Sequence, residues 1–161
     1  MTARDDCGRR TVVVGVGNEF RRDDGAGPAV IARLRALQPR DESLSGVTLA
    51  VSDGEPGRLI ELWAGAGLAV VIDAVRDSAM PPGHTRQLTA GALAGLADAA
   101  ASSHGIGLGA TVELARALGR LPARLTVLAV AGREFGYGTG LSAEVAAAVA
   151  DLAERVREVV R

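Results

Sequence analysis

The sequence predicts an α/β fold: a single three-layer domain with a twisted, mostly parallel sheet of about five strands and helices on both faces. Two observations predict this class. Short apolar runs alternate along the chain with segments of helical periodicity, which is typical of a parallel-rich sheet covered on both sides. The length of 161 residues and the 48% hydrophobic content are enough for one sizeable core. We expect a flexible, charged leader over residues 1–10 and one domain over residues 11–161.

The first half of the chain alternates between strands and helices. Residues 11–16 (TVVVGV) are mostly β-branched, which favours a strand buried on both faces. Residues 27–37 carry apolar side chains at helical spacing, and a proline is tolerated in the first turn of such a helix. Residues 47–51 are expected to form a second strand, and residues 55–63 a helix with an apolar face.

The second half repeats the alternation. Residues 68–72 (LAVVI) are expected to form a strand that ends on Asp73. Residues 84–88 follow a turn-rich sequence and fit an edge strand, whereas the alanine-rich residues 90–101 fit either a helix or a loop. A helix over 108–118, a strand over 125–131, a flexible glycine-rich loop over 132–140 and a helix over 142–160 complete the chain. Ser142 is suited to cap this last helix.

Composition excludes several function classes. A net charge of −1 and an aromatic content of 2% argue against nucleic-acid binding. No apolar run reaches the roughly 18 residues that span a bilayer, and the charged N-terminus does not resemble a signal peptide. Cys7 is the only cysteine, so an internal disulfide is impossible and a cytoplasmic location is expected. The chain contains no lysine, which excludes Schiff-base and P-loop lysine chemistry.

Polar residues of three separate loops are expected at one edge of the sheet. Asp23 and Asp24 follow the first strand, Asp73 ends the third, and His104 precedes the 108–118 helix. Sites of open α/β sheets lie at the carboxyl ends of the strands, so these side chains are candidates for a common site.

Of three kinds of chemistry that such a site could carry, the residues favour one. A dinucleotide loop is disfavoured because Phe20 stands where the third glycine of the fingerprint belongs, and because two aspartates would repel a pyrophosphate. Nucleophilic catalysis lacks a G-x-S-x-G elbow, and His84 fits an exposed loop residue. A metal site remains, since carboxylate and imidazole groups together suit Zn, Ni, Fe or Mn.

The metal reading has a structural alternative of equal weight. Asp24 could cap the following helix, Asp73 could cap the loop after its strand, and His104 could hydrogen-bond a neighbouring serine. The residue pattern alone leaves both readings open.

The same residues carry a family resemblance. The segment GVGNEFRRDDGAG (residues 15–27) resembles the N-terminal signature of the hydrogenase maturation proteases, which trim the C-terminus of the large subunit of [NiFe] hydrogenases. Four further segments are similar to family motifs in the same order: DGEPGRLIEL (53–62), VVIDAV (70–75), SSHGIGL (102–108) and GLSAEVAAAV (140–149). The resemblance extends over nearly the whole chain from Thr11.

The resemblance implies a function and a site. It implies a cytoplasmic, monomeric endopeptidase that removes the C-terminal extension of a [NiFe]-hydrogenase large-subunit precursor after nickel insertion. The metal-contacting and catalytic positions of the family fall on Asp24, Asp73 and His104. Nickel would be presented by the substrate, and another divalent metal could occupy the site in vitro. A metal-polarised water or carbonyl with a carboxylate base is the cleavage chemistry expected. The competing hypothesis is a nickel-dependent checkpoint or chaperone that binds the precursor without cutting it.

Two segments depart from the family pattern. Residues 19–22 are charged apart from Phe20, where apolar residues are common in the family, and Glu55 replaces the second glycine of a D-G-G segment. Arg21 and Arg22 could meet an acidic patch or the terminal carboxylate of the precursor, or simply form a solvated loop. Asn18, Asp53 and Gly54 are expected to contact the substrate; a turn-capping role is the alternative for Asp53.

Overall fold

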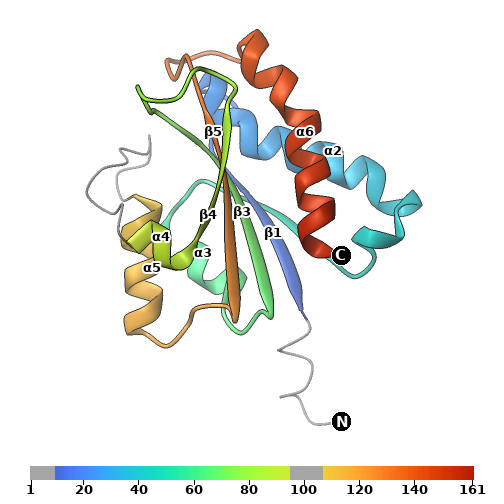
Figure 1. The fold of residues 1–161 in the computed structure, drawn as a ribbon, viewed down its shortest axis with the longest axis vertical. Coiled ribbons are helices and arrows are strands. Elements are labelled where there is room, and N and C mark those ends of the chain that lie inside the picture. Colours follow the sequence, from blue (N-terminus) through green and yellow to red (C-terminus); the bar gives the residue numbers. More distant parts are fainter. Residues whose placement is uncertain (1–9, 95–106) are drawn as a thin grey trace.

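The computed structural model describes residues 10–94 and 107–161, which form an α/β domain with a sheet between two layers of helices (Figure 1). The strands are β1 (Thr11–Val16), β2 (Thr48–Ser52), β3 (Leu68–Val75), β4 (Thr85–Thr89) and β5 (Arg124–Ala131). The helices are α2 (Ala26–Leu37), α3 (Pro56–Trp63), α4 (Ala90–Ala94), α5 (Leu108–Ala117) and α6 (Ala143–Val160). Short 3₁₀ turns are η1 (Arg22–Gly25), η2 (Gln38–Arg40) and η3 (Glu42–Leu44). The predicted fold class is confirmed.

Within the described residues the sheet has five strands in the order β2-β1-β3-β5-β4. All neighbouring pairs are parallel except β4 and β5, and β4 is an edge strand as predicted. The last residue of β1, Val16, is paired with Ser52 of β2 on one side and with Asp73 of β3 on the other. The loops that follow β1 and β2 therefore begin at the level of Asp73.

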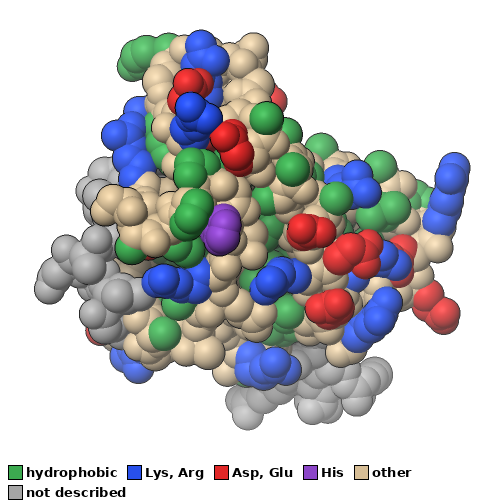
Figure 2. Space-filling view, turned by 45° about the horizontal axis from the view of Figure 1, so that its top comes forward, with side chains coloured by type: hydrophobic (Ala, Val, Ile, Leu, Met, Phe, Trp, Pro, Cys, Tyr) green, Lys and Arg blue, Asp and Glu red, His purple; other side chains and the backbone are tan. Residues whose placement is uncertain are grey.

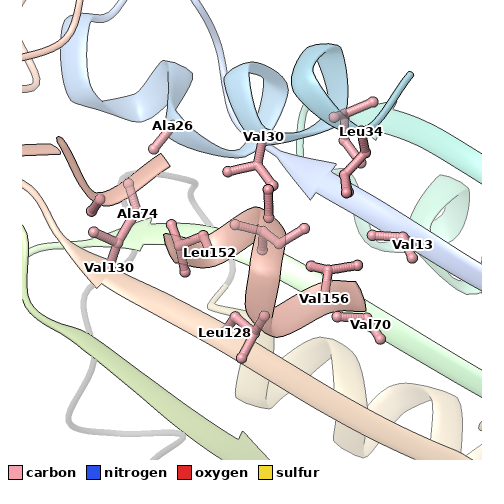
Figure 3. Close-up of a cluster of buried hydrophobic side chains, with 14 of the residues drawn as sticks. Val13, Ala26, Val30, Leu34, Val70, Ala74, Leu128, Val130, Leu152 and Val156 are labelled. Carbon is pink, nitrogen blue, oxygen red and sulfur yellow. The ribbon is translucent and has the colours of Figure 1, made fainter. Parts of the chain in front are cut away.

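Successive side chains of β1 enter two different cores. Val13 belongs to a cluster with Val70 of β3 and Leu128 of β5, which packs against α2 and α6 (Figure 3). Val12 and Val14 belong to the cluster on the opposite face, which includes side chains of α3 and α5. Since successive strand residues point to opposite faces, a run of valines is what a central strand between two helix layers requires.

Two glycines let α2 approach the sheet closely. A Cβ atom on Gly27 would lie 2.5 Å from the carbonyl oxygen of Val16 and 2.8 Å from that of Ile72. A Cβ atom on Gly15 would lie 2.3 Å from the carbonyl oxygen of Gly27. The first turn of α2 is thus seated on β1 and β3, and η1, directly before it, is fixed at the carboxyl edge of these strands.

Positively and negatively charged side chains are spread between hydrophobic ones over the face in Figure 2.

Arg10 donates hydrogen bonds from its guanidinium to the carbonyl oxygens of Leu62 (3.1 Å) and Ala64 (2.7 Å) at the end of α3. Among residues 10–94 and 107–161, no helix is long and apolar enough to cross a membrane.

Candidate active site

Asp24 is a buried carboxylate in the turn after β1. Its Oδ2 accepts a hydrogen bond of 2.9 Å from the backbone N–H of Asn18. The N-cap of α2 is Gly25, and no side chain caps this helix, so the alternative that Asp24 is a helix cap is wrong. Gly17 makes this loop possible: its φ is +146°, and a Cβ there would lie 1.8 Å from the carbonyl oxygen of Asp24.

Asp73 is the second buried carboxylate at this edge. The structure corrects the expected strand end, because β3 continues through Val75, paired with Ala131 of β5. Asp73 therefore lies inside the strand, between Val16 of β1 and Ala129 of β5, rather than in the loop after it. The turn η1 packs against β3, so the segments that carry Asp24 and Asp73 are in contact.

The buried acids of the described chain are concentrated here. Among residues 10–94 and 107–161, the buried carboxylates are Asp23, Asp24 and Asp73. Burial of a carboxylate is costly unless specific contacts compensate it, and such groups cluster at functional sites.

The third predicted ligand lies outside the described residues. His104 falls in the segment 95–106, so its place in the site stays a prediction. Within the described residues no group of three or more His, Cys, Asp or Glu side chains could hold a metal ion. A metal ion bound to Asp24 and Asp73 would therefore need further ligands from outside the described chain or from a bound substrate.

Asp23 has a role that the sequence did not reveal. Its Oδ2 accepts hydrogen bonds from the backbone N–H groups of Arg133 (2.7 Å) and Glu134 (3.0 Å) and from the Ser142 hydroxyl (2.9 Å). Its Oδ1 accepts from the backbone N–H of Ser142 (2.7 Å). These donors lie more than 100 positions away along the chain, and no local pattern indicates them. Asp23 thus joins the β1–η1 loop to the β5–α6 loop.

The contacts of Asp23 also set its protonation. Burial alone would raise the pKa of the Asp23 carboxyl, but the N–H groups of Glu134, Ser142 and Arg133 and the Ser142 hydroxyl outweigh it. The pKa of Asp23 is therefore lower than its usual value, because these donors stabilise the ionised form. Ser142 stands at the N-cap of α6 as predicted, but its hydroxyl bonds Asp23 instead of capping the helix.

The two arginines before Asp23 contact the glycine-rich 132–140 loop. The Arg21 guanidinium lies 6.0 Å from the centre of the Tyr137 ring. Arg22, with a φ of +50°, donates its backbone N–H to the carbonyl oxygen of Gly138 (3.1 Å), and its Nη1 lies 3.7 Å from Oε2 of Glu134. The contact of Arg21 and Arg22 with a substrate stays a prediction.

A groove beside the Asp24 loop is lined by two of the other predicted substrate residues, Asn18 and Asp53, but not by Gly54. It has a volume of about 550 Å³, and its lining includes Asn18, Phe20, Val51 and Asp53. Asn18 both lines this groove and donates its N–H to Asp24, so the groove begins at the Asp24 loop.

The turn after β2 has its own internal contacts. Oδ1 of Asp53 accepts the N–H of Glu55 (3.0 Å), which is a turn-capping contact, and Gly54 adopts a φ of +91°. Glu55 caps α3 by accepting the N–H groups of Gly57 (2.9 Å) and Arg58 (2.8 Å). The residue that departs from the D-G-G pattern thus has a structural role.

The family model for hydrogenase maturation protease (HycI) matches residues 51–159 of this chain. The chain belongs to the hydrogenase maturation protease family. The matched part includes Asp73, whereas Asp23 and Asp24 precede it. Membership of this family makes the protein a hydrogenase maturation endopeptidase by class.

Solved structures of maturation proteases have the same fold. The hydrogenase maturating endopeptidase HybD from E. coli aligns with a TM-score of 0.80 at 23% identity, over 94% of this chain and 92% of that one. The [NiFe] hydrogenase maturation protease HybD from Thermococcus kodakarensis aligns with a TM-score of 0.73 at 24% identity, over 94% and 99%. HycI from Thermococcus kodakarensis KOD1 aligns with a TM-score of 0.68 at 22% identity, over 94% and 92%. A comparison with curated proteins gave no match.

Proposed function

We propose that this protein removes the C-terminal extension of a [NiFe]-hydrogenase large-subunit precursor, and that it recognises nickel already inserted in that precursor. The observation that carries the proposal is the pair of buried carboxylates, Asp24 and Asp73, on two segments in contact at the carboxyl edge of the sheet. Family membership supplies the reaction class, which is peptide-bond cleavage in hydrogenase maturation.

The chemistry of the pair supports a metal carried by the substrate. Two carboxylates offer oxygen ligands, and His104 would add an imidazole nitrogen, which together suit a divalent ion such as nickel. An ion already ligated by the precursor can accept these groups at its open positions. Recognition of the ion would then restrict cleavage to precursors that have received their metal.

Asp24 and Asp73 would also serve cleavage directly. A carboxylate at the reacting centre can accept a proton from the attacking water, and a bound divalent ion would polarise the water or the scissile carbonyl. The groove that begins at Asn18 provides room for peptide on the β2 side of this centre.

The proposal is tested by the mass of the precursor. The purified protein is mixed with the nickel-loaded precursor and, separately, with nickel-free precursor, and both are analysed by mass spectrometry. We expect the loss of a C-terminal fragment only from the nickel-loaded sample. Binding of the loaded precursor with no change in its mass would contradict proteolysis and favour a non-catalytic checkpoint. Equal cleavage of both samples would contradict the recognition of nickel.

A further inference from the structure

The aromatic residues of this protein divide sharply by exposure. The chain has four, of which Trp63 and Phe135 are buried, whereas the side chains of Phe20 and Tyr137 are 62% and 91% exposed. Aromatic side chains are enriched at protein–protein interfaces relative to the rest of the surface. Phe20 and Tyr137 are therefore candidates for contact with a partner protein.

The fold brings these two residues onto paired loops. The backbone N–H of Gly138 donates to the carbonyl oxygen of Phe20 (2.9 Å), and the N–H of Arg22 donates to the carbonyl oxygen of Gly138 (3.1 Å). Arg21 and Gly138 form a parallel bridge. We call the two exposed side chains of Phe20 and Tyr137, which these paired loops carry, the aromatic rim.

The loops that carry the aromatic rim are held in place by contacts with the rest of the fold. Arg21 contacts the Tyr137 ring, and Phe135 anchors the same loop in the core, in the space that a side chain on Gly132 would need. Asp23 adds four hydrogen bonds at the base of the two loops. A surface ordered before binding loses less conformational entropy when a partner binds.

The aromatic rim is also continuous with the candidate active site. The N–H of Phe20 donates to Oδ1 of Asn18 (2.9 Å), and the N–H of Asn18 donates to the Asp24 carboxylate (2.9 Å). Phe20 lines the groove beside Asp24 together with Val51, which is itself exposed. A protein that presents a peptide to Asp24 and Asp73 would meet the aromatic rim with its adjacent surface.

We propose that the aromatic rim docks the folded body of the large-subunit precursor, in addition to the contacts that the site makes with the peptide. This inference rests on the proposed function. The partner surface is expected to be apolar at its centre with polar groups around it, because Arg22 and Glu134 flank the rim as an ion pair. A folded surface fits better than an extended peptide, because Tyr137 is almost fully exposed and does not line the groove.

The test compares binding and cleavage in matched variants. Phe20→Ala, Tyr137→Ala and the double variant are titrated with the nickel-loaded precursor that carries its extension. The control is Leu118→Ala, because this leucine is 56% exposed at the end of α5 and lies outside both the rim and the groove. We expect each rim variant to raise Kd about tenfold and the double variant to raise it further. We expect the control to change neither Kd nor cleavage, and all variants to keep the melting temperature of the wild type.

The two readouts separate the rim from the proposed function. A double variant that binds the precursor as tightly as the wild type overturns the docking role. A fall in the cleavage rate at saturating precursor with unchanged Kd also overturns it. Binding that depends on the rim, without cleavage by the wild type, supports docking and contradicts the protease function. A wild-type dimer that the double variant abolishes, with precursor binding unaffected, would assign the rim to a second copy of this chain and overturn the proposal.

Discussion

Asp23 and Asp24 are adjacent and buried, yet their contacts differ. They lie in a 3₁₀ turn, in which successive side chains diverge by about 120° around the axis because there are three residues per turn. Asp23 accepts bonds from the β5–α6 loop, whereas Asp24 accepts the N–H of Asn18 in its own loop. Asp23 therefore holds the loops of the site together, whereas Asp24 is proposed to bind the metal and take part in cleavage.

The role proposed for Asp24 predicts the effect of removing its charge. Asp24→Asn keeps an oxygen that can accept the N–H of Asn18, so the loop should persist. We expect precursor cleavage to slow by about 100-fold or more, because the carboxylate is lost as a ligand and base. Mass spectrometry of timed samples measures the rate.

The control for this variant is Asp151→Asn, since Asp151 is exposed on α6. It should cleave like the wild type. A rate for Asp24→Asn within about threefold of the wild type would remove Asp24 from the reaction.

The contacts of Asp23 predict a pH-dependent contribution to stability. The pKa of Asp23 is lower in the folded protein than the ordinary value of 3.8. Ionisation of this carboxyl therefore stabilises the folded state relative to the unfolded state. This stabilisation is fully present above the unfolded pKa and is lost as the pH falls through the folded pKa.

Asp23→Asn should reduce the free energy of unfolding by about 3 kcal/mol at pH 7, because an amide serves the four donors poorly. The difference between wild type and variant should narrow as the pH falls below about 4. Urea unfolding at several pH values measures both quantities. A difference that stays constant down to the acid limit of folding would mean that the charge of Asp23 contributes nothing.

At the scale of elements, the position of α2 decides how close Asp24 comes to Asp73. The helix starts directly after η1, and its first turn is in close contact with β1 and β3 through Gly27. No side chain larger than hydrogen fits at this position without displacement of α2.

Gly27→Ala is therefore expected to impair the site as well as the fold. The added methyl would meet backbone atoms of Val16 and Ile72, which cannot move without disturbing the sheet. We expect a loss of stability of about 1–3 kcal/mol, and a fall in precursor cleavage that persists at temperatures where the variant is fully folded. Thermal unfolding and timed cleavage are the measurements.

Gly91→Ala is the matched control, since this exposed helical glycine has open surroundings and alanine favours helix. This variant should retain the stability and the precursor cleavage of the wild type. Normal cleavage by folded Gly27→Ala would show that the spacing of α2 and the sheet does not determine activity.

At the scale of the whole molecule, we propose that the domain folds without the first nine residues. Arg10 bonds the end of α3, and its carbonyl oxygen accepts the N–H of Gly67 (2.9 Å) before β3. A protein that starts at Arg10 should keep the melting temperature of the full chain. The same shortened protein with Arg10→Ala should melt several degrees lower, because it loses two hydrogen bonds to carbonyl groups. A much lower melting temperature for the protein that starts at Arg10 would mean that residues 1–9 make contacts needed for stability.

Much of the architecture could be predicted from the sequence, because it depends on local periodicity. The β-branched runs at residues 11–16 and 68–72 mark central strands, and the turn-rich segment before residue 84 marks an edge strand. The end of β3 was misplaced by a few residues, because the strand is prolonged by its pairing with β5 rather than by its own composition.

The site was less predictable than the fold. Asp24 and Asp73 could be proposed because the sequence placed them at strand ends of an α/β sheet and because they match the family motifs. The structure shows both carboxylates buried on segments in contact, while their roles stay a prediction. The role of Asp23 could not be found, because its donors are backbone N–H groups in a loop that is distant in sequence. For the same reason the glycine-rich 132–140 loop was expected to be flexible, although its base is bonded to Asp23.

The bond between Asp23 and Ser142 has a consequence for the order in which the protein is made. It joins residues 119 positions apart, so Asp23 leaves the ribosome long before its partner does. A nascent chain that has already formed the first strand and the Asp23–Asp24 turn still lacks the donors that stabilise this turn. The contact can form only after the C-terminal part of the chain has been synthesised. A chain truncated before Ser142 would therefore lack two of the four hydrogen bonds that Asp23 accepts, including the bond that its Oδ1 accepts.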